Sequence, residues 1–160
     1  MYKRILVPVD GSSASTRGLQ EAVRFAKDQQ ARLRIIHVVD EAVLAQYPEM
    51  MDASGDMLTK FVDDGRKTLQ KALALAERQG IKADTVMYRK LMGALADFIV
   101  REAEKWRADI IVIGTAGATG MKHFFLGSDA EAIARSTKLP VLLVHDSAGK
   151  AAKKTARRRS

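Results

Sequence analysis

The sequence contains no cysteine, which excludes a disulfide scaffold and thiolate chemistry. It also contains no apolar run approaching the 18 residues of a membrane-spanning helix, and the N-terminal Met-Tyr-Lys-Arg leads directly into a predicted strand rather than a signal peptide. We therefore expect a soluble, cytoplasmic protein without a membrane span. A chain of 160 residues is long enough to form one domain with its own core.

Acidic residues are absent from the C-terminal end. Residues 150–160 carry six basic side chains and no acid, whereas residues 1–149 hold 21 basic and 19 acidic side chains. The net charge of +8 therefore belongs mainly to a tail. We expect a folded domain over residues 1–146 and a disordered basic tail over 147–160, because the tail has too little apolar surface to order itself. Weak nucleic-acid binding through the tail is one alternative function; an extension that only aids solubility is an equally good interpretation.

The pattern of apolar residues predicts five strands that alternate with four helices. The strands are expected at residues 3–9, 33–39, 83–88, 109–113 and 140–145, and the helices at about 12–30, 56–79, 93–106 and 129–135. A loop of about 15 residues with Pro48 and Gly55 is expected before the second helix. This alternation is typical of a doubly wound α/β fold with a parallel sheet. In such sheets ligands bind beyond the carboxyl ends of the strands, where the strand order reverses.

A glycine pattern follows the fourth predicted strand. Gly114-Thr-Ala-Gly117 is followed by nine residues and then by Gly127-Ser128. Three positions without Cβ allow an anion to approach the backbone closely, and the predicted helix start at Ser128 adds free N–H groups. No lysine follows the last glycine, so the pattern is not a P-loop. The alternative interpretation is that these glycines only turn the chain between strand and helix.

A second unusual loop, Val9-Asp10-Gly11-Ser12, ends the first predicted strand. The first and fourth strands are the candidates for the point where strand order reverses, so both loops are expected on one edge of the sheet. This coincidence favours the phosphate interpretation. Alternatively, Asp10 caps the first helix. A phospho-accepting role for Asp10 is disfavoured, because the further acidic residue that would hold Mg²⁺ near the first strand is missing.

The remaining titratable residues form no catalytic pattern. His37, His123 and His145 are scattered and have no cysteine partners, which disfavours a zinc site; His37 is expected to bond within or beside the sheet. The sequence has no positioned general base, P-loop lysine or clear pair of Mg²⁺ carboxylates. We therefore expect that the protein is not an enzyme, or at most a slow ATPase. A slow nucleotide hydrolase of related fold is an alternative function.

From residue 1 to about residue 145 the sequence resembles the universal stress protein family. The resemblance is carried by the glycine pattern and by the segments 5–12, 36–39, 93–99, 108–114 and 140–144. It implies a three-layer Rossmann-like fold (adenine nucleotide alpha hydrolase-like), with a five-stranded parallel sheet in the order 3-2-1-4-5 and four helices. It also implies a homodimer through the fifth strand. That strand, Val141, Leu142, Leu143 and Val144, is uncharged, and an apolar edge strand of this kind tends to pair with another copy.

The glycines resemble those of the ATP-binding branch of the family, whose members bind ATP, ADP or AMP as regulators or sensors in the stress response. The resemblance implies these nucleotide-binding residues: Pro8, Val9, Asp10, Gly11, Ser12, Val38, Ile113, Gly114, Gly117, Gly127, Ser128 and Asp129. In this interpretation Gly117, Gly127, Ser128 and the backbone of Asp129 face phosphate, and Ile113 and Gly114 lie beside the ribose. Val38 contacts adenine, and Asp10 lies near the ribose hydroxyls or a Mg²⁺ ion bound with the nucleotide.

The sequence departs from that branch near the phosphates. Ala116 and Ala118 stand where many ATP-binding members carry a basic residue, and Asp129 places a carboxylate beside the expected phosphates. Two like charges about 4–6 Å apart repel each other by roughly 1 kcal/mol or more. Lys122 and His123 are the cationic side chains inside the loop that can compensate.

Overall fold

The computed structural model describes residues 1–50, 54–116 and 127–146. Its strands are β1 (Arg4–Pro8), β2 (Arg32–Asp40), β3 (Ala83–Lys90), β4 (Ile110–Thr115) and β5 (Val141–His145). All neighbouring strands pair in parallel, in the order β3-β2-β1-β4-β5. The predicted strand order is therefore confirmed.

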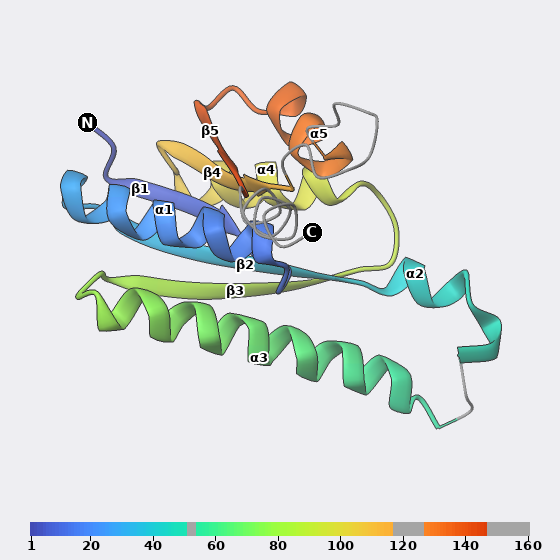
Figure 1. Ribbon diagram of the computed structural model, residues 1–160. Helices are drawn as coiled ribbons and strands as arrows, with labels where there is room; N and C mark the ends of the chain where they lie inside the picture. The colour runs from blue at the N-terminus through green and yellow to red at the C-terminus, as the bar shows by residue number, and fades with distance from the viewer. Residues whose placement is uncertain (51–53, 117–126, 147–160) are drawn as a thin grey trace, which may run out of the picture.

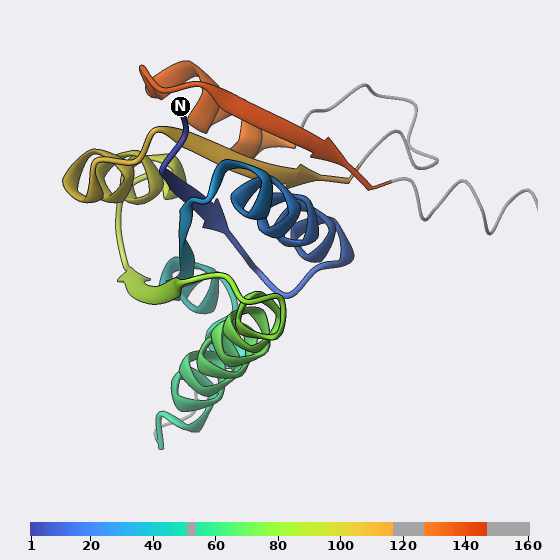
Figure 2. The same ribbon diagram turned by 90° about the vertical axis from the view of Figure 1, so that its left-hand side faces the viewer.

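Helices cover both faces of the sheet, so the molecule has three layers (Figures 1 and 2). The long helices are α1 (Ser13–Gln29), α3 (Asp56–Arg78), α4 (Leu95–Trp106) and α5 (Ser128–Ser136). α1 and α3 pack on one face of the sheet, and α4 and α5 pack on the other. Among the described residues, no helix has the length and apolar character needed to span a membrane.

The segment between β2 and α3 differs from the expected loop. It contains a short helix, α2 (Glu41–Ala45), and a 3₁₀ turn, η1 (Pro48–Met50). The Asp40 side chain starts α2 by accepting a hydrogen bond from the Ala42 amide at 3.1 Å. The expectation of four helices is therefore wrong by one short helix, because five residues are too few to show a helical period.

Two apolar cores lie on the two faces of the central strands. Ile5, Leu6 and Val7 of β1 have no exposed surface, as expected for a parallel strand covered on both faces. The core under α1 and α3 contains Leu19, Val23 and Ala26, which lie three or four residues apart on one side of α1. The second core, under α4 and α5, contains Leu6, Ile36, Ile99, Ile111 and Ile133.

Helix α1 lies unusually close to β4 because two glycines face each other. A Cβ on Gly114 would lie 1.8 Å from the Ala14 carbonyl oxygen, and a Cβ on Gly18 would lie 2.5 Å from the Gly114 nitrogen. Neither position has room for a side chain. Gly114 is therefore required by helix packing, whatever else it contacts.

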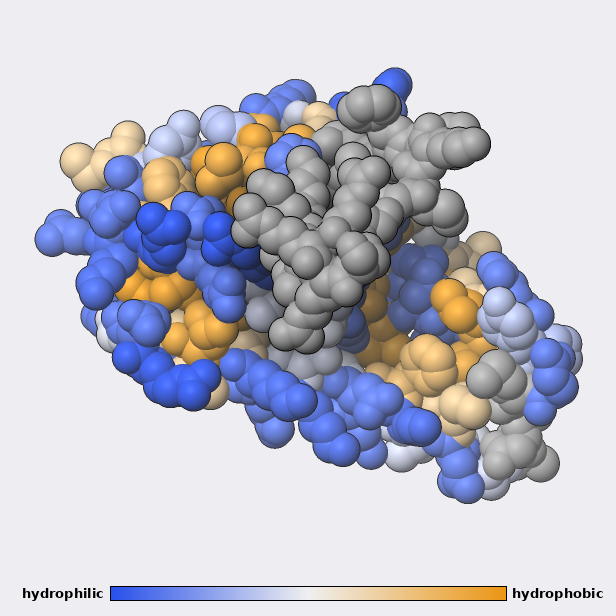
Figure 3. All heavy atoms as spheres, viewed as in Figure 1, coloured by the Kyte–Doolittle hydropathy of each residue, from blue (hydrophilic) through white to orange (hydrophobic). Residues whose placement is uncertain are grey.

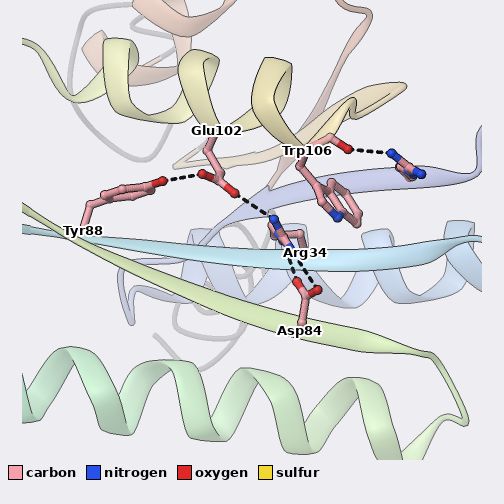
Figure 4. Close-up of polar contacts among 6 residues, drawn as sticks. Arg34, Asp84, Tyr88, Glu102 and Trp106 are labelled. Atoms are coloured by element: carbon pink, nitrogen blue, oxygen red, sulfur yellow. Dashed lines mark hydrogen bonds and ion pairs between the residues drawn. The ribbon is translucent and has the colours of Figure 1, made fainter.

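A buried polar network ties β2 and β3 to α4 (Figure 4). Glu102 is only 2% exposed; its carboxylate accepts hydrogen bonds from Arg34 Nη1 at 2.9 Å and from the Tyr88 hydroxyl. Arg34 also pairs with both carboxylate oxygens of Asp84, at 2.6 and 2.8 Å, and lies 4.9 Å from the centre of the Trp106 ring. The hydrogen bond to Glu102, with added burial, raises the pKa of Tyr88. The network therefore holds α4 against the outer strands.

Candidate functional site

A cavity of about 440 Å³ lies at the carboxyl ends of β1 and β4. Within the sheet, β2 and β3 lie to one side of β1, and β4 and β5 lie to its other side. The strand order therefore reverses between β1 and β4. Residues from β1, β2, β4, α4 and α5 line the cavity. Its volume is within the range of small-molecule sites, roughly 300–1,000 Å³.

The structure brings most of the predicted site residues together around this cavity. Those that line it are Pro8, Val9, Asp10, Ser12, Val38, Ile113, Gly114, Gly127, Ser128 and Asp129. Gly11 does not line it; with φ of +84° it turns the chain between Asp10 and Ser12. Gly117, Lys122 and His123 lie outside the described residues.

One end of the cavity is apolar. Ile36 and Val38 of β2 face Leu95 and Ile99 of α4, with Ile133 of α5 beside them. Leu95 and Ile99 are not among the site residues expected from the sequence. Only the packing of α4 over β2 shows that they line the cavity. This end suits a flat, apolar group.

The turn between β1 and α1 forms a polar wall. Ser12 caps α1, since its Oγ accepts a hydrogen bond from the Ser15 amide at 3.1 Å. Asp10 Oδ1 accepts a hydrogen bond from the Ser12 amide at 2.9 Å and so holds the turn before the cap. The interpretation of Asp10 as the helix cap is therefore wrong; Ser12 has that role.

The Asp10 carboxyl is held in its ionised form. Partial burial raises its pKa, but hydrogen bonds from Ser12 and Ser15 and the nearby His37 ring together outweigh burial, so the pKa lies below its ordinary value. His37 Nδ1 lies 2.8 Å from the Val9 carbonyl oxygen, which confirms the expected position of this ring beside the sheet. The cavity thus has a permanent negative charge on its rim at neutral pH.

The amino end of α5 forms the opposite polar wall. Gly127 precedes α5 with φ of +81°, and no side chain in the described ranges caps the helix there. Its first-turn amides are therefore available to an acceptor in the cavity. Asp129 is in the same turn, where a carboxylate is favourable to the empty helix but repels a phosphate.

Cations are missing from the described part of the cavity wall. Its lining residues include the carboxylates of Asp10 and Asp129 but no lysine, arginine or histidine. In the parts of the chain that the structure describes, no group of three or more potential ligands is placed to hold a metal ion. The described part of the wall therefore offers an anionic ligand no cationic side chain.

The carboxyl ends of β4 and β5 meet at the cavity rim. Thr115 lines the cavity, and its Oγ1 lies 2.9 Å from His145 Nδ1. Ser13 also lines the cavity and donates a hydrogen bond to Asp146 Oδ2 at 2.6 Å. The end of the edge strand β5 therefore helps to position the cavity wall.

Comparison with known proteins agrees with this architecture. The model of the universal stress protein family matches residues 1–145. The chain belongs to the universal stress protein family. A universal stress protein of Methanocaldococcus jannaschii is 37% identical to it over 145 residues, which cover 90% of this chain and 82% of that protein.

Solved structures of universal stress proteins share the fold. A family protein from Burkholderia pseudomallei is 29% identical, with a TM-score of 0.69, and the match covers 89% of this chain and 96% of that one. A universal stress protein in complex with cAMP is 25% identical, with a TM-score of 0.62, and the match covers 90% and 97% of the two chains. The predicted family and fold are thus confirmed.

Proposed function

We propose that this universal stress protein binds an adenine nucleotide in the cavity between β1 and β4 and acts as a regulatory protein. The observation that carries the proposal is the pairing, in one cavity, of an apolar end on β2 and α4 with the uncapped amino end of α5 behind Gly127. An adenine base fits the apolar end, and a phosphate fits the amino end of α5. The cAMP complex of a family member supports an adenine ligand.

The cavity suggests an orientation for the nucleotide. The adenine ring lies against Val38 and Leu95, and the phosphates lie at the backbone of Gly127 and Ser128. Asp10, between these two ends, accepts hydrogen bonds from the ribose hydroxyls. Its hard oxygen atoms also suit Mg²⁺, but the described residues supply no complete ligand set. Mg²⁺ would therefore arrive with ATP or ADP, whereas AMP needs less counter-charge.

The proposal is tested by replacing Gly127 with valine. A β-branched side chain at this position blocks the approach of phosphate to the backbone. We expect nucleotide affinity to fall more than about tenfold, equivalent to about 1.4 kcal/mol. Isothermal titration with ATP, ADP and AMP, each with and without Mg²⁺, measures the change and identifies the preferred ligand.

Gly55→Val is the matched control. Gly55 also precedes a helix and has φ of +72°, but it does not line the cavity. Both variants therefore carry the strain of a branched residue in the left-handed region. Equal loss of binding in both would trace the effect to strain, and unchanged binding in Gly127→Val would place the phosphates elsewhere. A wild-type protein that binds none of the three nucleotides would refute the function.

We also propose that the nucleotide is not turned over at an enzymatic rate. The described cavity wall contains no lysine or arginine to stabilise a transferring phosphoryl group. Slow hydrolysis is the alternative. Phosphate release at about 1 s⁻¹ or faster, the range of ordinary enzymes, would contradict a purely regulatory role.

The third part of the proposal is a homodimer through β5. The strand order places β5 at one edge of the sheet, and Leu142 on this strand is 36% exposed. No charged side chain interrupts residues 141–144, so the edge lacks the usual protection against pairing. Antiparallel pairing with β5 of a second copy, about a two-fold axis, would satisfy the free backbone groups.

A further inference from the structure

A second cavity, of about 400 Å³, lies between α1 and α3 on the face of the sheet that these helices cover. We refer to it as the α1–α3 groove. The α3 residues that line it include Thr68, Lys71, Leu75 and Arg78, whose spacing of three or four places them in one stripe along the helix. From Thr68 to Arg78 the stripe is about 15 Å long at the helical rise per residue. Figure 3 shows apolar surface between the two helices, bordered by hydrophilic side chains.

The floor of the groove is apolar. Val9, Leu19 and Ala72 are almost fully buried beneath it, and Leu75 packs beside them against the core. A hydrocarbon segment placed here would contact these side chains and remove its own apolar surface from water. Burial of apolar surface is worth roughly 25 cal/mol per Å², so the floor favours a ligand with an apolar body.

The rim of the groove is cationic. Lys71 and Arg78 line it, and no lining residue is acidic. Neither side chain forms an ion pair or hydrogen bond with any residue in the described ranges. Arg66, one turn earlier on the same helix, is by contrast paired with Asp63 at 3.1 Å. The two unpaired cations therefore complement a negatively charged group.

We propose that the α1–α3 groove binds a small amphipathic anion, namely a carboxylate on an acyl chain. The chain lies along Ala72 and Leu75, and the carboxylate lies among the rim cations. This site is on the other face of the sheet from the nucleotide cavity, but Val9 and Ser15 line both. The site is independent of the proposed nucleotide function, and its test uses no nucleotide.

The test titrates the full-length protein with decanoate, using calorimetry and amide NMR. We expect saturable binding, with shifted amides centred on the groove stripe of α3 and the facing turn of α1, and weaker binding of the neutral 1-decanol. Lys71→Glu and Arg78→Glu replace attraction by repulsion, so each is expected to weaken decanoate binding roughly fivefold, about 1 kcal/mol. Both side chains are exposed, so the fold tolerates these changes.

Lys60→Glu is the matched control. Lys60 is an exposed cation on the same helix but does not line the groove, and it lies eleven residues before Lys71, too far along the helix to pair with it. The charge change is therefore identical, and decanoate affinity is expected to stay unchanged. Equal weakening in all three variants would reduce the effect to net charge and overturn the proposal. The absence of binding at millimolar decanoate, or shifted amides confined to the cavity at β1 and β4, would overturn it as well.

Discussion

Gly18 and Gly114 set the distance between α1 and the sheet, and this contact is open to a direct test. In Gly18→Ala the new methyl group would lie 2.5 Å from the Gly114 nitrogen. Backbone atoms cannot rotate away, so the helix must shift. Overpacking of this kind costs roughly 1–3 kcal/mol, more than the 0.5–1 kcal/mol that alanine gains over glycine within a helix. We expect Gly18→Ala to lower the free energy of unfolding, measured in urea.

Gly65→Ala on α3 is the control for helix propensity. Its methyl group would meet the His37 ring at 2.7 Å, a side chain that can move aside, rather than backbone. We therefore expect a smaller loss of stability than in Gly18→Ala. If the two variants were equally stable, close packing at Gly114 would not be a constraint on the fold.

Single residues also show the limits of sequence analysis. Gly114 was assigned to the ribose by resemblance, but the structure adds a packing reason that depends on a helix about 100 residues earlier in the chain. Glu102 went unnoticed, because it interrupts the apolar inward side of α4 and its partner Arg34 is 68 residues away. Contacts of this kind follow from the tertiary arrangement and leave no local pattern.

Among the elements, the attachment of α4 to β2 and β3 is expected to depend on the Arg34 network. Arg34→Met would leave the Glu102 carboxylate buried without its cation. Breaking a buried ion pair costs about 3–5 kcal/mol, whereas replacing both partners by apolar groups is often neutral. We therefore expect Arg34→Met to be strongly destabilised in urea, and Arg34→Met/Glu102→Met to recover part of the loss.

Arg66→Met is the comparison for that experiment. Arg66 and Asp63 form an exposed pair on α3, and such pairs contribute less than about 1 kcal/mol. A similar loss in Arg66→Met and Arg34→Met would show that burial of Glu102 is not the cause. A double variant no more stable than Arg34→Met would argue against an unpaired charge.

The long elements could be predicted because their apolar period repeats several times. The five strands and the helices α1, α3, α4 and α5 all lie where the pattern predicted them, within a few residues. α2 could not be predicted, since it contains a single turn of helix. The expected tail over 147–160 and the centre of the glycine loop lie outside the described residues, so those expectations stay predictions.

At the scale of the whole molecule, the proposed dimer is tested at Leu142. Leu143 packs partly buried against the core under α4 and α5, so a charge there would also damage the fold. Leu142 is exposed on the same edge strand, and Leu142→Lys would put two charges into a symmetric seam. We expect sedimentation velocity at micromolar concentration to show a dimer for wild type and a shift to monomer for Leu142→Lys.

Thr85→Lys provides the control on the opposite edge. Thr85 is in β3, the other outer strand of the sheet, so the same charge is added to an edge that the proposed dimer leaves free. If both variants dissociated, the dimer interface would not be specific to β5, or the added charge alone would cause dissociation. A wild-type protein that sediments as a monomer would refute the dimer.

The two hydrogen bonds at the cavity rim join the cavity wall to the end of the edge strand β5. Ser13 and Thr115 are held by Asp146 and His145, which stand where β5 ends. A ligand that accepts the Ser13 hydroxyl proton must replace the hydrogen bond that this hydroxyl donates to Asp146. A ligand in the proposed site would therefore lie one side-chain contact away from β5, the edge strand that forms the proposed dimer.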